Sequence, residues 1–190
     1  MFLGACRNHP QPADVSDNTP KTDTASDKFF PIAEFLQAEV SYVDSTPLAI
    51  LKCETVNKRT DSSFLTPNEF HRLAAGILTP ELFADSLEKN FTETSFADKT
   101  TGYLTFIYSP KNKEQALQQI NVLVSPGHDG ANRVKSIYLT RVERVSDTVV
   151  VKKMFWLAGH SFQVITSRQP AGKAAGIRQV QVVWNNGEAD

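Results

Sequence analysis

The spacing of apolar residues changes along the chain, from the helical period of 3.6 in its first half to the strand period of 2 beyond residue 102. Between residues 29 and 43 the apolar residues fall on one face at helical spacing, namely Ile32, Phe35, Leu36, Val40 and Val43. This spacing predicts an amphipathic helix over 29–43. Helices that precede a run of strands favour an α+β domain over a parallel α/β fold.

Two Thr-Pro pairs indicate where further helices begin. Thr66 is a good N-cap, Pro67 suits the first helical position, and Glu69 can close a capping box. A second pair begins at Thr79 and predicts another short helix. Between these helices and the first one, the apolar run 48–53 favours a strand or an extended segment.

The second half of the chain contains segments that are typical of strands, at 102–108, 120–124, 134–145, 149–157, 162–167 and 177–184. Most of the turns between them are short, which favours an antiparallel meander. Within 134–145, alternation places Ile137 and Leu139 on one face and Val134 on the other. We therefore expect two or three N-terminal helices packed on one face of a curved antiparallel meander sheet, in a single domain over residues 27–190.

Composition and motifs argue against several classes of function. The chain has 190 residues and a formal net charge of -1, with acidic and basic residues interspersed, so we expect no nucleic-acid partner. No apolar run approaches the roughly 20 residues of a membrane span. There are two cysteines, and the four histidines show no ligand spacing, so we expect no metal site. The phosphate-binding glycine motifs and the GxSxG motif are missing from the sequence, so we expect no cofactor and no catalytic residue.

The first residues carry the clearest signal for localisation. Leu3-Gly4-Ala5-Cys6 resembles the lipobox of bacterial lipoproteins, in which the cysteine becomes the acylated N-terminus. The polar segment 7–27 cannot bury enough apolar surface to offset its ordering entropy, so residues 1–26 are expected to be a lipobox remnant and a disordered tether. Because only Met1 and Phe2 precede the motif, either translation starts upstream or the sequence has been shortened.

A wider resemblance supports the same compartment. The tether, the segment FFPIAEFL, the Thr-Pro helix and the final strand VQVVWNN together resemble a group of uncharacterised lipoproteins of Bacteroidetes-type bacteria, over most of residues 27–186. The resemblance implies a membrane anchor at Cys6 and a location in the cell envelope, facing the periplasm. The expected architecture is also similar to that of periplasmic carriers with a curved sheet, as an analogy of fold alone.

Aromatic residues of the strands are the best candidates for lining a ligand pocket. Those that we consider are Tyr103, Phe106, Tyr108, Tyr138, Trp156 and Trp184. Aromatic side chains on a concave sheet can line a site for an apolar ligand, but they can equally form the core beneath the helices. Cys53 lies in an apolar run and is expected to be a core residue.

Two other groups of residues have a simpler interpretation. Lys152, Lys153, Arg141 and Arg144 could form a basic face, but a solvated sheet surface is the expectation. The glycine-rich segment 127–132 is expected to be a turn.

The sequence thus predicts a membrane-anchored lipoprotein with a non-catalytic binding role, whose partner is an apolar ligand or an envelope protein. The alternative is a small envelope enzyme or inhibitor that uses a cleft on the same sheet. Histidines and carboxylates gathered in one cleft would favour that enzyme.

Overall fold

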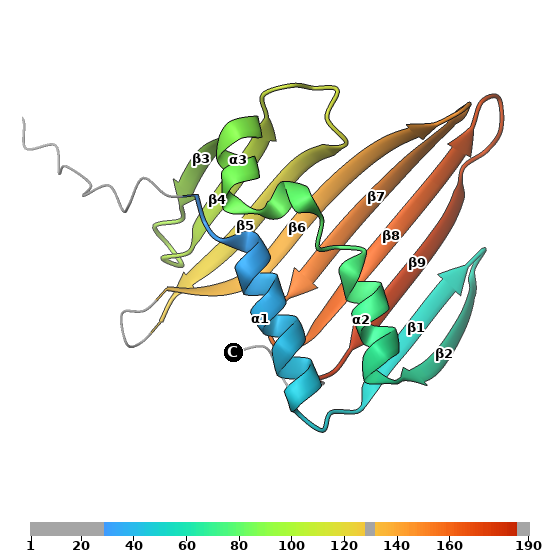
Figure 1. Cartoon of the computed structure of the whole chain (residues 1–190), viewed down its shortest axis with the longest axis horizontal. Helices are drawn as coiled ribbons and strands as arrows, with labels where there is room; N and C mark the ends of the chain where they lie inside the picture. The colour runs from blue at the N-terminus through green and yellow to red at the C-terminus, as the bar shows by residue number, and fades with distance from the viewer. Residues whose placement is uncertain (1–28, 128–131, 186–190) are drawn as a thin grey trace, which may run out of the picture.

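The computed structural model describes residues 29–127 and 132–185, which form a nine-stranded antiparallel sheet with helices on one face (Figure 1). The helices are α1 (Ile32–Ser45), α2 (Pro67–Ala75), α3 (Ala84–Asn90) and the short 3-10 helix η1 (Pro80–Leu82). The strands are β1 (Ile50–Val56), β2 (Arg59–Leu65), β3 (Phe91–Ala97), β4 (Leu104–Pro110), β5 (Leu117–Pro126), β6 (Asn132–Val145), β7 (Thr148–Leu157), β8 (Ser161–Pro170) and β9 (Gly176–Val183). The predicted α+β class with an antiparallel sheet is confirmed. Cys6, the tether and residues 128–131 of the expected turn lie outside the described residues.

Helix α1 places its apolar stripe on the sheet. Its buried residues Ile32, Leu36, Val40 and Val43 belong to the same core cluster as the strands. Glu39 on the same helix accepts hydrogen bonds from the Trp156 indole Nε1 at 3.2 Å and from the Gly159 amide at 2.6 Å, both in or next to β7. One carboxylate therefore fixes the helix to the β7–β8 connection.

The helix starts later than the apolar spacing predicts. Pro31 is its N-cap, with backbone angles outside the helical region. Phe29 and Phe30 precede it and pack against the core, and the Phe30 ring lies 6.4 Å from the ring of Phe106. These two aromatic residues therefore contribute to the core before the helix begins.

Helix α2 has the capping box that its sequence predicts. The Glu69 amide donates to Thr66 Oγ1 at 3.4 Å, and the Thr66 amide donates to Glu69 Oε2 at 2.9 Å. The first bond adds to the one that the Glu69 amide makes with the Thr66 carbonyl at 3.0 Å, and the second gives the Thr66 amide, at the N-cap, a side-chain acceptor. Phe70 and Ala74 form the buried face of α2, and the Phe70 ring packs against Phe162 of β8.

We expect Thr66→Ala to lower the free energy of unfolding by about 1 kcal/mol, the usual value for a lost N-cap side chain. Urea denaturation of the full chain measures this loss. Thr66→Ser keeps the hydroxyl group and should recover most of the stability. If Thr66→Ala and Thr66→Ser unfold at the same urea concentration, the cap does not contribute as described.

The strand order is β2-β1-β9-β8-β7-β6-β5-β4-β3. Strands β3 to β9 follow one another as neighbours, as a meander requires. The N-terminal hairpin β1–β2 is then added beside β9, with Lys52 opposite Val182. The chain therefore crosses the helix-bearing face between β2 at one edge and β3 at the other, and α2, η1 and α3 form this crossing (Figure 1).

Both edge strands, β2 and β3, are missing from the sequence prediction. Every residue of β2 is exposed except the half-buried Leu65, and in β3 only Phe91 is fully buried. An edge strand has one neighbour and little packing, so its sequence needs no strict apolar alternation. The β1–β2 turn is also hard to recognise in the sequence, because its two residues with positive φ, Asn57 and Lys58, do not include a glycine.

Two β-bulges interrupt the pairing of β5 with β6. At one of them Leu123 pairs with Ser136 and Val124 pairs with Val134, so Lys135 is the extra residue on β6. The extra residue turns Val134 toward the core, which corrects the face predicted for it, whereas Ile137 and Leu139 are buried as expected.

The opposite face of the sheet is not crossed by any helix of the described residues. Its side chains alternate between polar groups and half-exposed apolar groups such as Val142 and Phe155, which is 38% exposed. Cys53 lies on this face and is half-buried with a free thiol, which corrects its expected position in the core.

Candidate functional site

Three of the six aromatic candidates lie in the core beneath the helices. Tyr108, Trp156 and Trp184 are each at most 3% exposed. The Trp156 and Trp184 rings lie 5.4 Å apart and pack with Phe70 of α2 and Phe162 of β8. Burial and the neighbouring Glu93 carboxylate raise the pKa of Tyr108 well above its usual range. This part of the helix-bearing face is closed, and these aromatic rings fill it.

The other three aromatic candidates are dispersed. Phe106 is partly buried against the core, and Tyr103 is half-buried just before β4. Tyr138 points to the opposite face of the sheet, where its hydroxyl oxygen accepts a hydrogen bond from Thr140 Oγ1 at 3.1 Å. The six candidates therefore do not share one pocket, and the cavities described next are lined by other residues.

Side chains that face the helices form rows across β6, β7, β8 and β9, and successive rows change from apolar to cationic. The buried row consists of Ile137, Trp156, Phe162 and Val182. The next row toward the β6–β7 turn consists of Leu139, Met154, Val164 and Val180. The row after that consists of Arg141, Lys152, Thr166 and Arg178. The sheet extends beyond α1 and α2 toward the β6–β7 and β8–β9 turns (Figure 1).

Two cavities open where α2 ends above this polar row. The first, of about 200 Å³, lies between the C-terminal end of α2 and the sheet. Its lining residues are Arg72, Leu73, Gly76, Lys152, Phe162, Val164, Thr166, Arg178 and Val180. The second, of about 430 Å³, continues toward the β8–β9 turn and is lined by Val56, Asn57, Lys152, Thr166, Arg168, Gly176, Ile177 and Arg178. Because they share Lys152, Thr166 and Arg178, we treat them as one feature, the cationic groove.

The lining of the cationic groove carries charge of one sign. It includes Arg72, Lys152, Arg168 and Arg178, and none of its lining residues, all in the described part of the chain, is Asp or Glu. This contrasts with the formal net charge of -1 for the whole chain. A cleft lined by charge of one sign focuses the electrostatic potential and attracts ions of the opposite sign.

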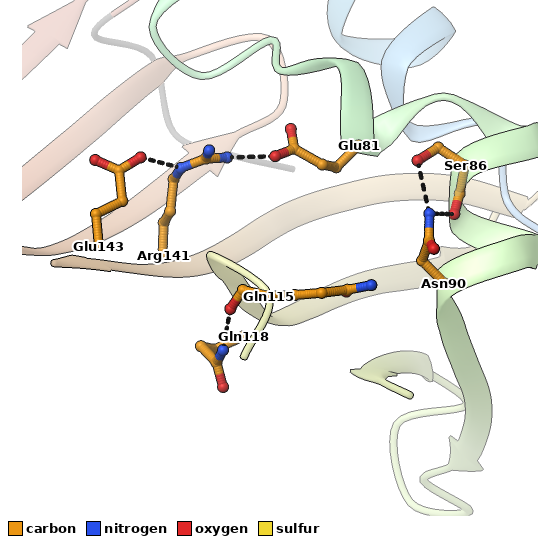
Figure 2. A network of polar contacts seen from close by, with 7 residues as sticks. All are labelled: Glu81, Ser86, Asn90, Gln115, Gln118, Arg141 and Glu143. Carbon is orange, nitrogen blue, oxygen red and sulfur yellow. Dashed lines mark hydrogen bonds and ion pairs between the residues drawn. The ribbon is translucent and has the colours of Figure 1, made fainter. Parts of the chain in front are cut away.

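Carboxylates beside the groove neutralise part of its charge. Glu54 accepts from Arg178 Nε at 2.7 Å and contacts Lys52 Nζ at 3.4 Å. The hydrogen bond from Arg178 is the main reason that the pKa of Glu54 lies below its ordinary value. Arg141 lies between two carboxylates, with Nε 2.6 Å from Glu143 and Nη1 3.0 Å from Glu81 of η1 (Figure 2).

Other cations of the groove have no such partner. Within residues 29–127 and 132–185, the side chains of Lys152 and Arg168 make no hydrogen bond and no ion pair. Lys152 is half-buried, and Arg141 lies directly opposite it on β6. Glu81 and Glu143 neutralise Arg141, so the main cost at this position is the partial desolvation of Lys152. The pKa of Glu143 is lowered by its hydrogen bond with Arg141 and also by the charge of Lys152, but Lys152 makes no direct ion pair with this carboxylate. This arrangement is suited to holding an anion.

The histidine and carboxylate contacts lie elsewhere. His71 of α2 contacts Asp44 of α1 on the surface, and neither residue lines the cationic groove. The contact joins two helices, which is a structural role.

Among the described residues, no group of three or more His, Cys, Asp or Glu side chains could hold a metal ion. In the same part of the chain, no helix has the length and apolar composition needed to cross a membrane.

Of the four residues of the basic face that the sequence predicts, one, Lys152, lines the cationic groove. Arg141 and Lys152 were grouped with Arg144 and Lys153 as one basic face, but strand alternation separates them, and only the first two face the helices. The short turn between β6 and β7 predicts that these strands pair, and this pairing places Arg141 opposite Lys152 on one face.

Comparisons with known proteins identify no relative: no protein-family model, no curated protein and no solved structure matches this chain.

Proposed function

We propose that this chain is a membrane-anchored lipoprotein of the cell envelope, facing the periplasm, with a non-catalytic binding role. The observation that supports a binding role is the cationic groove, which is open to solvent and combines unpaired cations with an apolar wall. The lipobox-like Leu3-Gly4-Ala5-Cys6 and the polar residues that follow it support the anchor. A polar segment of this length between Cys6 and residue 29 would let the folded domain act at a distance from the membrane surface.

The anchor is tested by metabolic labelling with an alkyne-bearing fatty acid, followed by detergent phase partition of the full protein from its native host. We expect the wild-type protein to carry the label and to enter the detergent phase. Cys6→Ser should lose the label and move to the aqueous phase, since Cys6 is the proposed acylation site. Cys53→Ser is the matched control and should behave as wild type. A wild-type protein that takes up no label would contradict the proposed anchor.

The binding role is tested by native mass spectrometry of the protein purified gently from the same host. An additional mass that is reproducible and that denaturation removes would identify a bound ligand. If the protein carries no ligand, a pull-down from envelope extracts that compares wild type with Lys152→Glu would test for a protein partner at the same groove. Neither a ligand nor a Lys152-dependent partner would be expected if the groove has no binding role.

A further inference from the structure

We infer that the cationic groove binds an anionic amphiphile, a molecule with a carboxylate or phosphate head and a short apolar group. This inference rests on the proposed binding role and specifies its ligand class. The head would lie against Lys152 and Arg168, beside the ion pair of Arg178 with Glu54. The apolar group would enter the cavity beneath the C-terminal end of α2.

The charge argument depends on which cations already have partners. Arg141 is held by Glu81 and Glu143, so it is neutralised within the protein. Lys152 and Arg168 have no ion-pair partner in the described residues, and Arg178 has only Glu54, which it shares with Lys52. A bound anion would supply the missing charge-assisted hydrogen bonds, which are roughly twice as strong as neutral ones.

The apolar argument depends on the second part of the groove. Beside Lys152 and Arg178, the smaller cavity is lined by Leu73, Val164 and Val180, which provide an apolar wall. Inorganic phosphate would leave this wall uncovered, and an uncharged apolar molecule would leave the cations unpaired. A molecule that carries both groups satisfies both parts of the groove at once.

The cavity volume limits the apolar group. The smaller cavity, of about 200 Å³, lies below the roughly 300–1,000 Å³ that is usual for sites of drug-sized ligands. This volume suits one short alkyl or aryl group and is too small for the paired chains of an intact phospholipid.

Isothermal titration of the full chain with hexyl phosphate, kept below its micellar concentration, tests the inference. We expect saturable binding, at least tenfold weaker binding of inorganic phosphate, and no binding of hexyltrimethylammonium. Equal affinity for inorganic phosphate would overturn the apolar part of the inference. Equal affinity for the cationic amphiphile would overturn the anionic part.

Variants then place the ligand in the groove. Lys152→Glu should weaken hexyl phosphate binding at least tenfold, which corresponds to about 1.4 kcal/mol. Lys153→Glu changes the adjacent residue, which faces the opposite side of the sheet, and should leave binding unchanged. Arg168 is exposed, so Arg168→Glu should weaken binding while the protein still folds, and Thr166→Trp should obstruct the groove. If Lys152→Glu and Arg168→Glu both bind as wild type does, the inference is wrong.

Two further measurements separate the possible outcomes. Flotation of the Cys6→Ser variant, which lacks the proposed anchor, with phosphatidylglycerol vesicles and with phosphatidylcholine vesicles shows whether the anionic head belongs to a membrane lipid or to a free amphiphile, since both share the same chemistry. In the same background, Lys152→Glu should abolish any flotation if the groove holds the headgroup. If native mass spectrometry detects a bound ligand that is neutral or cationic, the proposed binding role stands and this inference fails. A protein that carries no ligand, captures no partner and does not bind hexyl phosphate contradicts both.

Discussion

Trp156→Ala is expected to lower the free energy of unfolding by about 3–5 kcal/mol, the range for removing a large aromatic side chain from a packed core. Trp156 is 2% exposed and stacks on Phe162 with the ring centres 5.3 Å apart. The substitution also removes the indole that donates to Glu39, so α1 loses one of its links to the sheet. Since domains of this kind are stable by about 5–15 kcal/mol, the loss is a large share of the total.

Equilibrium denaturation in urea at neutral pH measures this effect, with Phe155→Ala as the matched control. Phe155 is the preceding residue on β7, but it points to the uncovered face and is 38% exposed. Its removal costs about 1 kcal/mol or less, mostly from the cross-strand contact with Tyr138. Similar losses for both variants would show that the helices do not close the core as described.

Apolar periodicity is sufficient to predict those elements that bury a continuous face. The stripe of Leu36, Val40 and Val43 identifies α1, and the alternation around Ile137 and Leu139 identifies β6. Periodicity reports burial, so it fails where burial is slight, which is why the two edge strands are missing from the prediction. Periodicity also fails at a β-bulge, because the extra residue Lys135 moves the residues that precede it to the other face of the sheet.

The pairing of β1 with β9 could not be predicted from local sequence. Short turns specify which successive strands become neighbours, but no turn joins these two strands. Their register, with Glu54 opposite Val180, is set by packing between distant parts of the chain. The candidate site depends on this pairing, because it brings Glu54 next to Arg178 and positions α2 above β8 and β9.

The candidate site was therefore visible in the sequence only as separate charges. Lys152 lies on β7, and Arg72 and Arg178 join it through the crossing helix α2 and the last strand β9. Aromatic residues are the stronger candidates from sequence alone, because their size and apolar character suit both a pocket and a core. Here Trp156 and Trp184 contribute to the core, and charged residues line the groove.

Arg141→Met is expected to lower the free energy of unfolding by about 2 kcal/mol at pH 7. The guanidinium group bridges Glu81 and Glu143, and its side chain is 18% exposed. Breaking a buried pair costs about 3–5 kcal/mol and breaking an exposed pair costs about 0–1 kcal/mol, so an intermediate value is expected. The other oxygen of Glu81, Oε2, is buried without a partner among the described residues, so losing Arg141 would leave this carboxylate with fewer compensating contacts.

The dependence on pH distinguishes lost charge pairing from lost packing. Burial raises the pKa of Glu81, but hydrogen bonds from its own backbone, Thr79 and Arg141 outweigh it and hold the pKa below 4.5. The hydrogen bond from Arg141 likewise lowers the pKa of Glu143. A carboxyl group whose pKa is depressed by folding stabilises the protein above its unfolded pKa, and this contribution is lost as the pH falls through the folded pKa. The difference between wild type and Arg141→Met should therefore be largest above about pH 5 and should shrink steadily toward pH 3.

Urea denaturation at pH 7 and at pH 3.5 provides the comparison, with Arg144→Met as the control on the same strand. Arg144 is exposed and faces the other side of the sheet, so its substitution should change stability by less than about 0.5 kcal/mol at either pH. Met matches much of the length of the arginine stem, so packing alone would give a loss independent of pH. If the loss in Arg141→Met stays constant between the two pH values, the bridge of Glu81, Arg141 and Glu143 stabilises the fold by packing and not by charge.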